Sequence, residues 1–203
     1  MKRIIAWVLI AFLVLGVCAM FFTSCAMKPG TNYAKENTQM NFHDHTDSQI
    51  EKMDFSHEPE SVIYLAGGCF WGIEHLMQSM PGVLTATSGY ANGSGAAQAN
   101  YKDVCAKETG FRETVRVEYD PSKISLDALL LAYFYVIDPT SVNRQGNDVG
   151  SQYQAGVYYT NDAAKEVVER IADIERARTD GFAVEIGPLF NFYEAEDYHQ
   201  DYL

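Results

Sequence analysis

The sequence has few cysteines and little positive charge. Its 203 residues include 4 cysteines, and only Cys69 and Cys105 lie beyond residue 57. They form neither a Cys-X-X-Cys pair nor a dense even set, which argues against a zinc knuckle and a disulfide-stabilised scaffold. Residues 58–203 hold 10 Lys and Arg against 22 Asp and Glu, a net charge of −12. Such an acidic domain repels phosphate backbones, so nucleic acid is not an expected partner.

Long apolar runs are also scarce, and the one present lies at the N-terminus. A basic Met-Lys-Arg start precedes 19 apolar residues, 4–22, followed by Thr-Ser-Cys25. This pattern is typical of an export signal. Phe-Thr-Ser-Cys resembles the lipobox of bacterial lipoproteins, in which Cys25 is lipidated and becomes the mature N-terminus. An uncleaved membrane anchor is the alternative, because the run is about long enough to span a bilayer. Both interpretations of residues 1–25 place the remainder in the cell envelope, exported and tethered to a membrane.

Residues 26–57 are polar and have no sustained period, which predicts a disordered linker before a single domain at 58–203. His43, His45 and His57 fall in this linker. Without fixed geometry or a cysteine nearby, they do not predict a metal site.

The domain alternates strand-like and helix-like segments. Apolar runs and period-two alternation predict strands over 61–66, 83–90, 113–120, 153–159 and 182–187. Helical spacing predicts helices over 71–80, 125–138 and about 161–178. The second of these helices begins at Ser125, and the third at Thr160 or Asn161, which are residues suited to capping. Alternation without regular parallel βαβ units favours an α+β fold of two layers.

Cys69 lies between the first strand and the first helix, in the sequence GGCFWG. A helix N-terminus stabilises a thiolate, and the glycines leave the sulfur unobstructed. A structural cysteine needs neither feature, so the residues alone leave a reactive and a structural Cys69 open. Phe70 and Trp71 are accordingly either core residues or the walls of an apolar pocket.

Polar partners for the thiol lie at the edges of predicted loops. Glu113 starts a strand, where partial desolvation raises the pKa of a carboxyl group. Tyr101 follows a predicted Gly/Ala/Asn loop at 91–100, and Asp148 and Tyr153 lie in and just after a predicted polar loop at 141–152. Each alone is more often an ordinary surface residue, and His75 and His199 show no evident role.

Seven blocks of the domain occur in the order found in peptide methionine sulfoxide reductase A, and the sequence resembles that family over nearly the whole domain. The blocks are GCFWG (68–72), GYANG (89–93), YKDVC (101–105), TG followed by ETV (109–115), YDP (119–121), QGNDVGSQY (145–153) and FYEAEDYHQDYL (192–203). The resemblance implies an α+β two-layer sandwich with a mixed sheet and a ferredoxin-like core. It also implies reduction of the S epimer of methionine sulfoxide, free or in proteins.

The resemblance assigns roles to seven residues. It implies that Cys69 is the nucleophile and that Glu113 protonates the sulfoxide oxygen. It implies that the hydroxyls of Tyr101 and Tyr153 bind this oxygen and that Asp148 is a supporting carboxylate. Phe70 and Trp71 are then the walls of the pocket for the S-methyl group. Attack by the thiolate releases methionine and leaves a sulfenic acid on Cys69. No metal or organic cofactor is implied, and a monomer that uses an external thiol reductant such as thioredoxin is expected.

Three departures from the family pattern bear on this mechanism. Phe111-Arg112 replaces the usual His-Ala, and we expect Arg112 to face outward, because an inward cation would lower the pKa of Glu113. Gln154 stands where arginine is frequent. The sequence stops at Leu203, where the family usually continues into a tail with resolving cysteines. Cys105 is then the only other domain thiol, and we expect it to be a bystander.

Two other functions are alternatives to sulfoxide reduction: a second type of thiol enzyme and a binding module without catalysis. A thiol peroxidase would place Arg and Thr, rather than Phe70 and Trp71, around Cys69. A tethered module that binds oxidised methionine without turnover would have no need of Cys69 and Glu113 together.

Overall fold

The computed structural model describes residues 50–203 except Lys107. The predicted leader at 1–25, with Cys25, and linker residues 26–49 lie outside the described residues. Among the described residues, no helix has the length and apolar character needed to cross a membrane.

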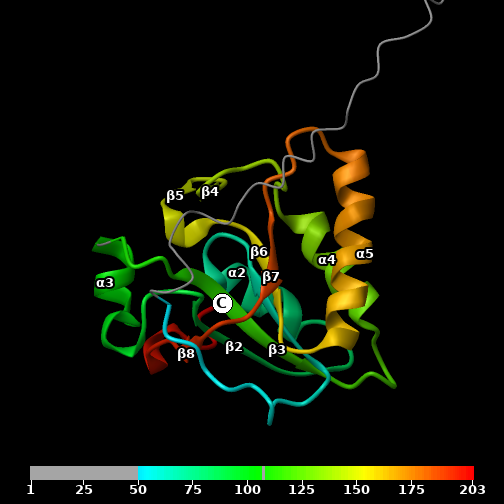
Figure 1. Ribbon diagram of the computed structural model, residues 1–203, viewed down its shortest axis with the longest axis horizontal. Helices are drawn as coiled ribbons and strands as arrows, with labels where there is room; N and C mark the ends of the chain where they lie inside the picture. Colours follow the sequence, from blue (N-terminus) through cyan, green and yellow to red (C-terminus); the bar gives the residue numbers. More distant parts are fainter. Residues whose placement is uncertain (1–49, 107) are drawn as a thin grey trace, which may run out of the picture. The chain divides into compact units, whose positions relative to one another are not determined.

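The centre of the domain is a mixed sheet of six strands in the order β7-β6-β1-β3-β2-β8 (Figure 1). Only β6 and β7 are parallel; the other neighbours are antiparallel. The strands are β1 (Val62–Ala66), β2 (Val83–Ala91), β3 (Arg112–Tyr119), β6 (Gly156–Tyr159), β7 (Glu185–Pro188) and β8 (Phe192–Glu194). All five predicted strands form, and β8 is additional. A separate hairpin, β4 (Arg144–Gln145) and β5 (Asp148–Val149), lies within the polar loop predicted at 141–152.

The three predicted helices form, with a fourth short one. They are α2 (Phe70–Gln78), α4 (Leu126–Val136) and α5 (Asp162–Arg178), and the fourth is α3 (Tyr101–Ala106). The predicted caps act as expected: Ser125 Oγ accepts from Ala128 N at 3.3 Å, and Asn161 Oδ1 accepts from Ala164 N at 2.9 Å. Within the described residues there are also three short 3₁₀ turns: η1 (Ala96–Gln98), η2 (Ser151–Tyr153) and η3 (Asp197–His199).

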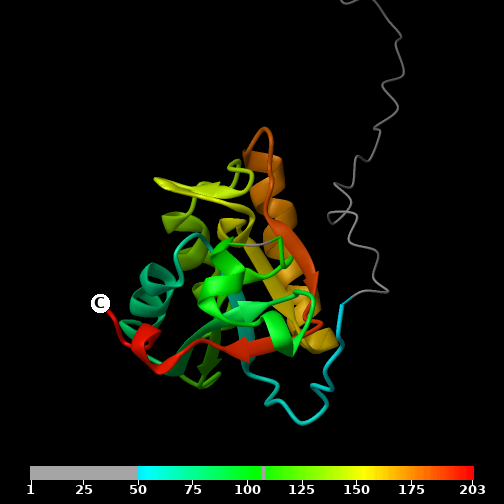
Figure 2. The ribbon, with the colours of Figure 1, turned by 90° about the vertical axis from the view of Figure 1, so that its left-hand side faces the viewer.

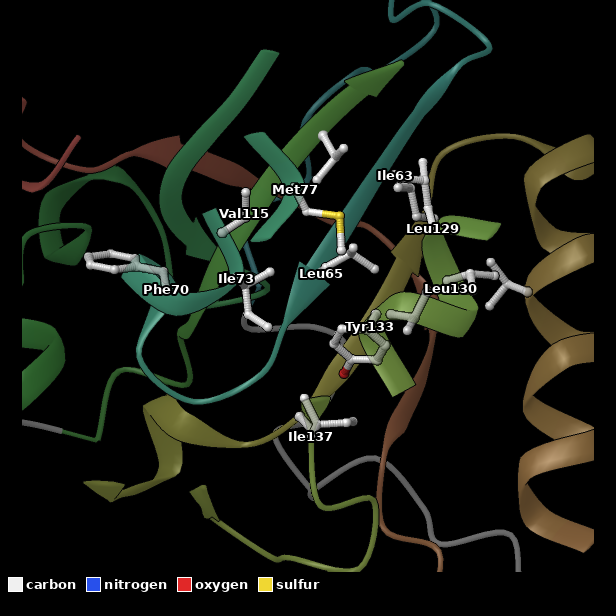
Figure 3. Close-up of a cluster of buried hydrophobic side chains, with 14 of the residues drawn as sticks. Ile63, Leu65, Phe70, Ile73, Met77, Val115, Leu129, Leu130, Tyr133 and Ile137 are labelled. Carbon is white, nitrogen blue, oxygen red and sulfur yellow. The ribbon is translucent and has the colours of Figure 1, made fainter. Parts of the chain in front are cut away.

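The alternation of the strands gives the sheet two apolar faces. One face packs against α2, α4 and α5 in a continuous buried cluster, to which β1 contributes Ile63 and Leu65 and α2 contributes Phe70, Ile73 and Met77 (Figure 3). Each large apolar side chain buried in this way contributes about 1.5–3 kcal/mol. The packing therefore fixes α2, and with it the turn that holds Cys69, against the sheet. A mixed α+β fold, as the sequence predicts, is confirmed.

The opposite face is covered in part by residues that composition assigns to the linker. Phe55 packs edge-on against Tyr64, with ring centroids 6.2 Å apart. Met53 N donates to Phe190 O at 2.8 Å, and Asn191 Nδ2 donates to Glu51 O at 2.7 Å. Because this face exposes apolar side chains that need a cover, the polar segment 50–57 packs on the domain. The packed chain thus extends to residue 50, before the boundary predicted at 58.

Candidate active site

The turn between β1 and α2 positions Cys69 at the N-terminus of a helix. Cys69 is the N-cap residue of α2. Gly68 precedes it with φ +83°, and a Cβ at this position would lie 2.6 Å from Gln145 Cβ. Glycine is therefore required both for the left-handed backbone and for the close approach of β4. This approach brings the β4–β5 hairpin, which carries Asp148, against the turn.

The environment of Cys69 opposes ionisation of its thiol. Burial raises the pKa of Cys69 to about 11, and the carboxylates of Glu113 and Asp148 act in the same direction. The backbone N–H groups of Trp71 and Gly72 lower the pKa, as expected for a helix N-terminus, but by less. The helix N-terminus thus acts in the predicted direction, but desolvation outweighs it, so the pKa of Cys69 lies above its ordinary value and not below it. At neutral pH, Cys69 is a thiol.

Glu113 is a buried carboxyl group next to the turn that holds Cys69. Its side chain comes from β3 and only 2% of the residue is exposed. Oε2 accepts a hydrogen bond from Phe70 N, the amide that follows Cys69, at 3.2 Å. Burial raises the pKa of Glu113 to about 7, with a further rise from Asp148 and an opposing effect of the Phe70 N–H. A carboxyl group with this pKa is able to donate a proton near neutral pH.

Two tyrosines complete the polar part of the site. Burial raises the pKa of Tyr153, and the charge of Glu113 adds to the rise. The pKa of Tyr101 is raised first by the Cys105 thiol, with which its hydroxyl forms a hydrogen bond, and then by burial and Glu113. Asp148 acts electrostatically on Tyr153 as well as on Glu113. The fold thus gathers the polar residues predicted from the sequence at one place.

The apolar part of the site combines two predicted residues with three that the sequence did not single out. The rings of Phe70 and Trp71 lie 6.3 Å apart. His199 is buried beside both, with its ring centroid 5.3 Å from that of Phe70 and 5.7 Å from that of Trp71. Tyr198 packs on His199, and Tyr202 stacks on Trp71. The signal was the aromatic density of FYEAEDYHQDYL (192–203), for which no role was assigned.

Two of the three residues that depart from the family pattern, Arg112 and Gln154, have structural roles. Arg112 points to the sheet face opposite Glu113 and so away from the carboxyl group. The prediction that it faces outward into solvent is wrong, because only 5% of the residue is exposed. Its Nη2 lies 2.8 Å from Glu185 Oε1, so an ion pair compensates the buried cation. Gln154 is buried and bridges Asn143 N and Ala183 O, which closes the base of the 141–152 loop.

The described residues contain no group of three or more His, Cys, Asp or Glu side chains that could hold a metal ion. Cys69 and Cys105 are both free thiols, and Cys105 is exposed. Burial of its sulfur raises the pKa of Cys105, which lowers its reactivity as a nucleophile.

Comparisons with known proteins identify the family of this chain. A family model described as peptide methionine sulfoxide reductase matches residues 61–203. Mxr1 from Saccharomyces cerevisiae in reduced form superposes with a TM-score of 0.65 at 37% identity, covering 70% of this chain and 83% of Mxr1. Methionine sulfoxide reductase A of Corynebacterium diphtheriae superposes with a TM-score of 0.63 at 35% identity, covering 72% and 75%. The chain therefore belongs to the peptide methionine sulfoxide reductase family of enzymes.

Proposed function

We propose that the protein reduces the S epimer of methionine sulfoxide, in proteins and as the free amino acid, through a sulfenic acid on Cys69. The observation that carries the proposal is the pair formed by Cys69 and Glu113. Glu113 Oε2 lies 3.2 Å from the amide that follows the thiol, and its pKa is raised to about 7. A sulfoxide sulfur becomes a good electrophile only when its oxygen is protonated, and Glu113 is suited to supply that proton.

The remaining residues bind the substrate on both sides of the reacting sulfur. The hydroxyls of Tyr101 and Tyr153 stay protonated at neutral pH because their pKa values are raised, so both can donate to the sulfoxide oxygen. Trp71 offers aromatic surface to the S-methyl group, and the ring of Phe70, a residue that is only 1% exposed, lies beside it in the core and supports this wall. Asp148 helps to keep Glu113 protonated through its negative charge.

The reaction balances without a metal or an organic cofactor. The thiolate of Cys69 attacks the protonated sulfoxide sulfur, and methionine leaves with the electron pair that the thiolate supplied. The sulfoxide S–O bond breaks as a new bond forms between this oxygen and the Cys69 sulfur, which becomes a sulfenic acid. The proton on that oxygen is the one that Cys69 first passed to Glu113, so Glu113 ends as a carboxylate. An external thiol of the thioredoxin class then attacks the sulfenic sulfur and releases water. A second thiol of that reductant resolves the mixed disulfide.

The direct test is an assay on the two pure sulfoxide epimers with dithiothreitol, and then with thioredoxin, as reductant. Reduction of the S epimer alone is expected. The donors to the sulfoxide oxygen lie on one side of the site and the pocket for the methyl group on the other, so only one epimer fits both. Peroxide consumption in place of sulfoxide reduction would favour a thiol peroxidase. Binding of the sulfoxide without turnover would favour a tethered binding module.

The leader supports a proposed location for this activity. We infer from residues 1–25 that the enzyme is exported and tethered in the cell envelope, where it repairs oxidised exported proteins. Lipid labelling that disappears in Cys25→Ala is the expected result. A mature protein that still begins at Met1 and takes up no lipid would show an uncleaved anchor instead.

A further inference from the structure

A second buried carboxyl group, Glu74, lies in the helix that Cys69 begins, and the proposed reaction does not use it. Only 2% of Glu74 is exposed. Its Oε1 accepts from Ser88 N in β2 at 3.2 Å, and its Oε2 accepts from Asp201 N at 3.0 Å. Burying a carboxyl group is unfavourable unless its oxygens are hydrogen-bonded. Glu74 meets this condition by joining two backbone segments that are far apart in the sequence.

The segment that Glu74 holds is the C-terminal strap, defined here as residues 196–203, which runs beside α2 (Figure 2). Gln200 fastens the strap to β2, because its side chain accepts from Ser88 N and donates to Ser88 O, both at 2.9 Å. Gln78 Nε2 adds a bond to Asp201 Oδ1 at 2.7 Å. Asp201 has φ +53°, a conformation that costs free energy in a residue other than glycine. The strap is thus held in a specific, mildly strained path.

This path brings Tyr202 onto a wall of the proposed substrate pocket. The rings of Tyr202 and Trp71 are stacked, with centroids 3.8 Å apart and planes 12° from parallel. Tyr202 is 59% exposed, so it is not fixed by burial in the core. Its position follows from the preceding residue, whose amide Glu74 binds.

The other end of the strap contacts the oxygen side of the site. Glu196 Oε1 accepts from Tyr101 N at 3.0 Å, and Glu196 Oε2 accepts from Tyr90 Oη at 2.9 Å. The strap therefore contacts both Trp71 and Tyr101, and Glu74 anchors its far end to the nucleophile helix.

We propose that Glu74 is a positioning residue, which latches the C-terminal strap to α2 and through Tyr202 sets the plane of the Trp71 indole. This inference rests on the proposed function, in which Trp71 binds the S-methyl group. A wall held in place before binding avoids the entropy cost of ordering it with the substrate. Loss of the latch should therefore weaken substrate binding more than it slows proton transfer at Glu113.

The test compares Glu74→Gln and Tyr202→Leu in the full-length chain. Glutamine has one acceptor oxygen instead of two, so one of the two hydrogen bonds of Glu74, from Ser88 N or from Asp201 N, is lost, while Ser88 N keeps Gln200 Oε1 as an acceptor. For each variant, KM for a methionine S-sulfoxide peptide is expected to rise about tenfold, with kcat within about threefold of the parent. The double variant should show little further loss, because both changes act on the same ring. Glu58→Gln, which weakens the ion pair with Arg116 on the other sheet face, is the matched control and should leave KM unchanged.

Tryptophan fluorescence separates a latch from a merely structural residue. The chain has two tryptophans, so the variants are made in a Trp7→Phe background that leaves Trp71 as the reporter. Loss of the stack should shift the Trp71 emission to the red in both variants. If Glu74→Gln does not fold, Gln78→Ala, which removes an exposed bond to the strap, should cause smaller shifts in the same directions.

Two outcomes would overturn the inference. One is a lower melting temperature of Glu74→Gln with Trp71 emission and KM both unchanged. The other is full additivity of the Glu74 and Tyr202 effects on KM. A red shift with KM unchanged would instead support the latch and contradict the role of Trp71 in substrate binding, so failure of the proposed function is recognisable on its own.

Discussion

Replacing Cys69 with serine should abolish the reduction of methionine S-sulfoxide, a loss of about 10⁴-fold or more, as is usual when a nucleophile is removed. A serine alkoxide does not form near neutral pH, and no step of the proposed reaction proceeds without sulfur at this position. The oxygen replaces the sulfur of a half-exposed side chain, so the fold should be retained. Initial rates with dithiothreitol and thermal unfolding measure the two effects.

Cys105→Ser is the matched control for this experiment, because it removes the other thiol of the domain. Turnover with dithiothreitol should be essentially unchanged. Activity of Cys69→Ser within about tenfold of the parent would refute the assignment of the nucleophile.

Replacing Glu113 with glutamine should slow the reductase step by roughly 10²–10⁴, the usual contribution of a positioned proton donor. The amide still donates a hydrogen bond to the sulfoxide oxygen, so substrate binding should change far less. Single-turnover rates and a binding titration separate the two. Equal losses in binding and in rate would mean that Glu113 is a structural residue.

The pH dependence of kcat/KM provides a second signature of Glu113. In the free protein, the pKa of Glu113 is about 7 and that of Cys69 about 11. Between these values the pair holds one proton, and the reactive arrangement, with the proton on Glu113 and a thiolate on Cys69, is a constant minor fraction. Below about pH 7 a second proton binds, and kcat/KM should fall about tenfold per pH unit.

The plateau above pH 7 should disappear in Glu113→Gln. With glutamine in place, only the Cys69 thiol titrates, and kcat/KM should rise with pH throughout the range in which the protein is stable. A plateau of the same shape in the variant would assign the break to another group.

Local signals in the sequence were sufficient for most of the fold. Ser125 was predicted as one cap and Thr160 or Asn161 as the other, because a capping side chain binds an amide only three positions along the chain; the structure shows Ser125 and Asn161 in these roles. Periodicity likewise gave the five longer strands. The strand β8 has three residues, too few for a period, and it forms because β2 offers it a free edge. The C-terminal strap is fixed by contacts such as Glu74 with Asp201, which span 127 positions and leave no local pattern.

The candidate site also combines residues with a local signal in the sequence and residues that only distant contacts bring together. The glycine turn pointed to Cys69, but its partners were selected by the family resemblance, since sheet pairing rather than spacing brings Glu113 to the thiol. The sign of the Cys69 pKa shift was missed because a helix N-terminus is visible in the sequence and burial is not. Arg112 was misplaced for a similar reason: its partner, Glu185, lies on a strand 73 positions away.

The most direct test of the central claim is the mass of the protein after one turnover with methionine S-sulfoxide in the absence of reductant. The proposed mechanism predicts one added oxygen atom on Cys69, reactive toward a sulfenic acid reagent such as dimedone, together with an unmodified thiol at Cys105. One equivalent of methionine should be released. Methionine release with both thiols lost to a disulfide, abolished in Cys105→Ser, would show that Cys105 resolves the intermediate. Methionine release with Cys69 left as a free thiol would contradict the mechanism itself.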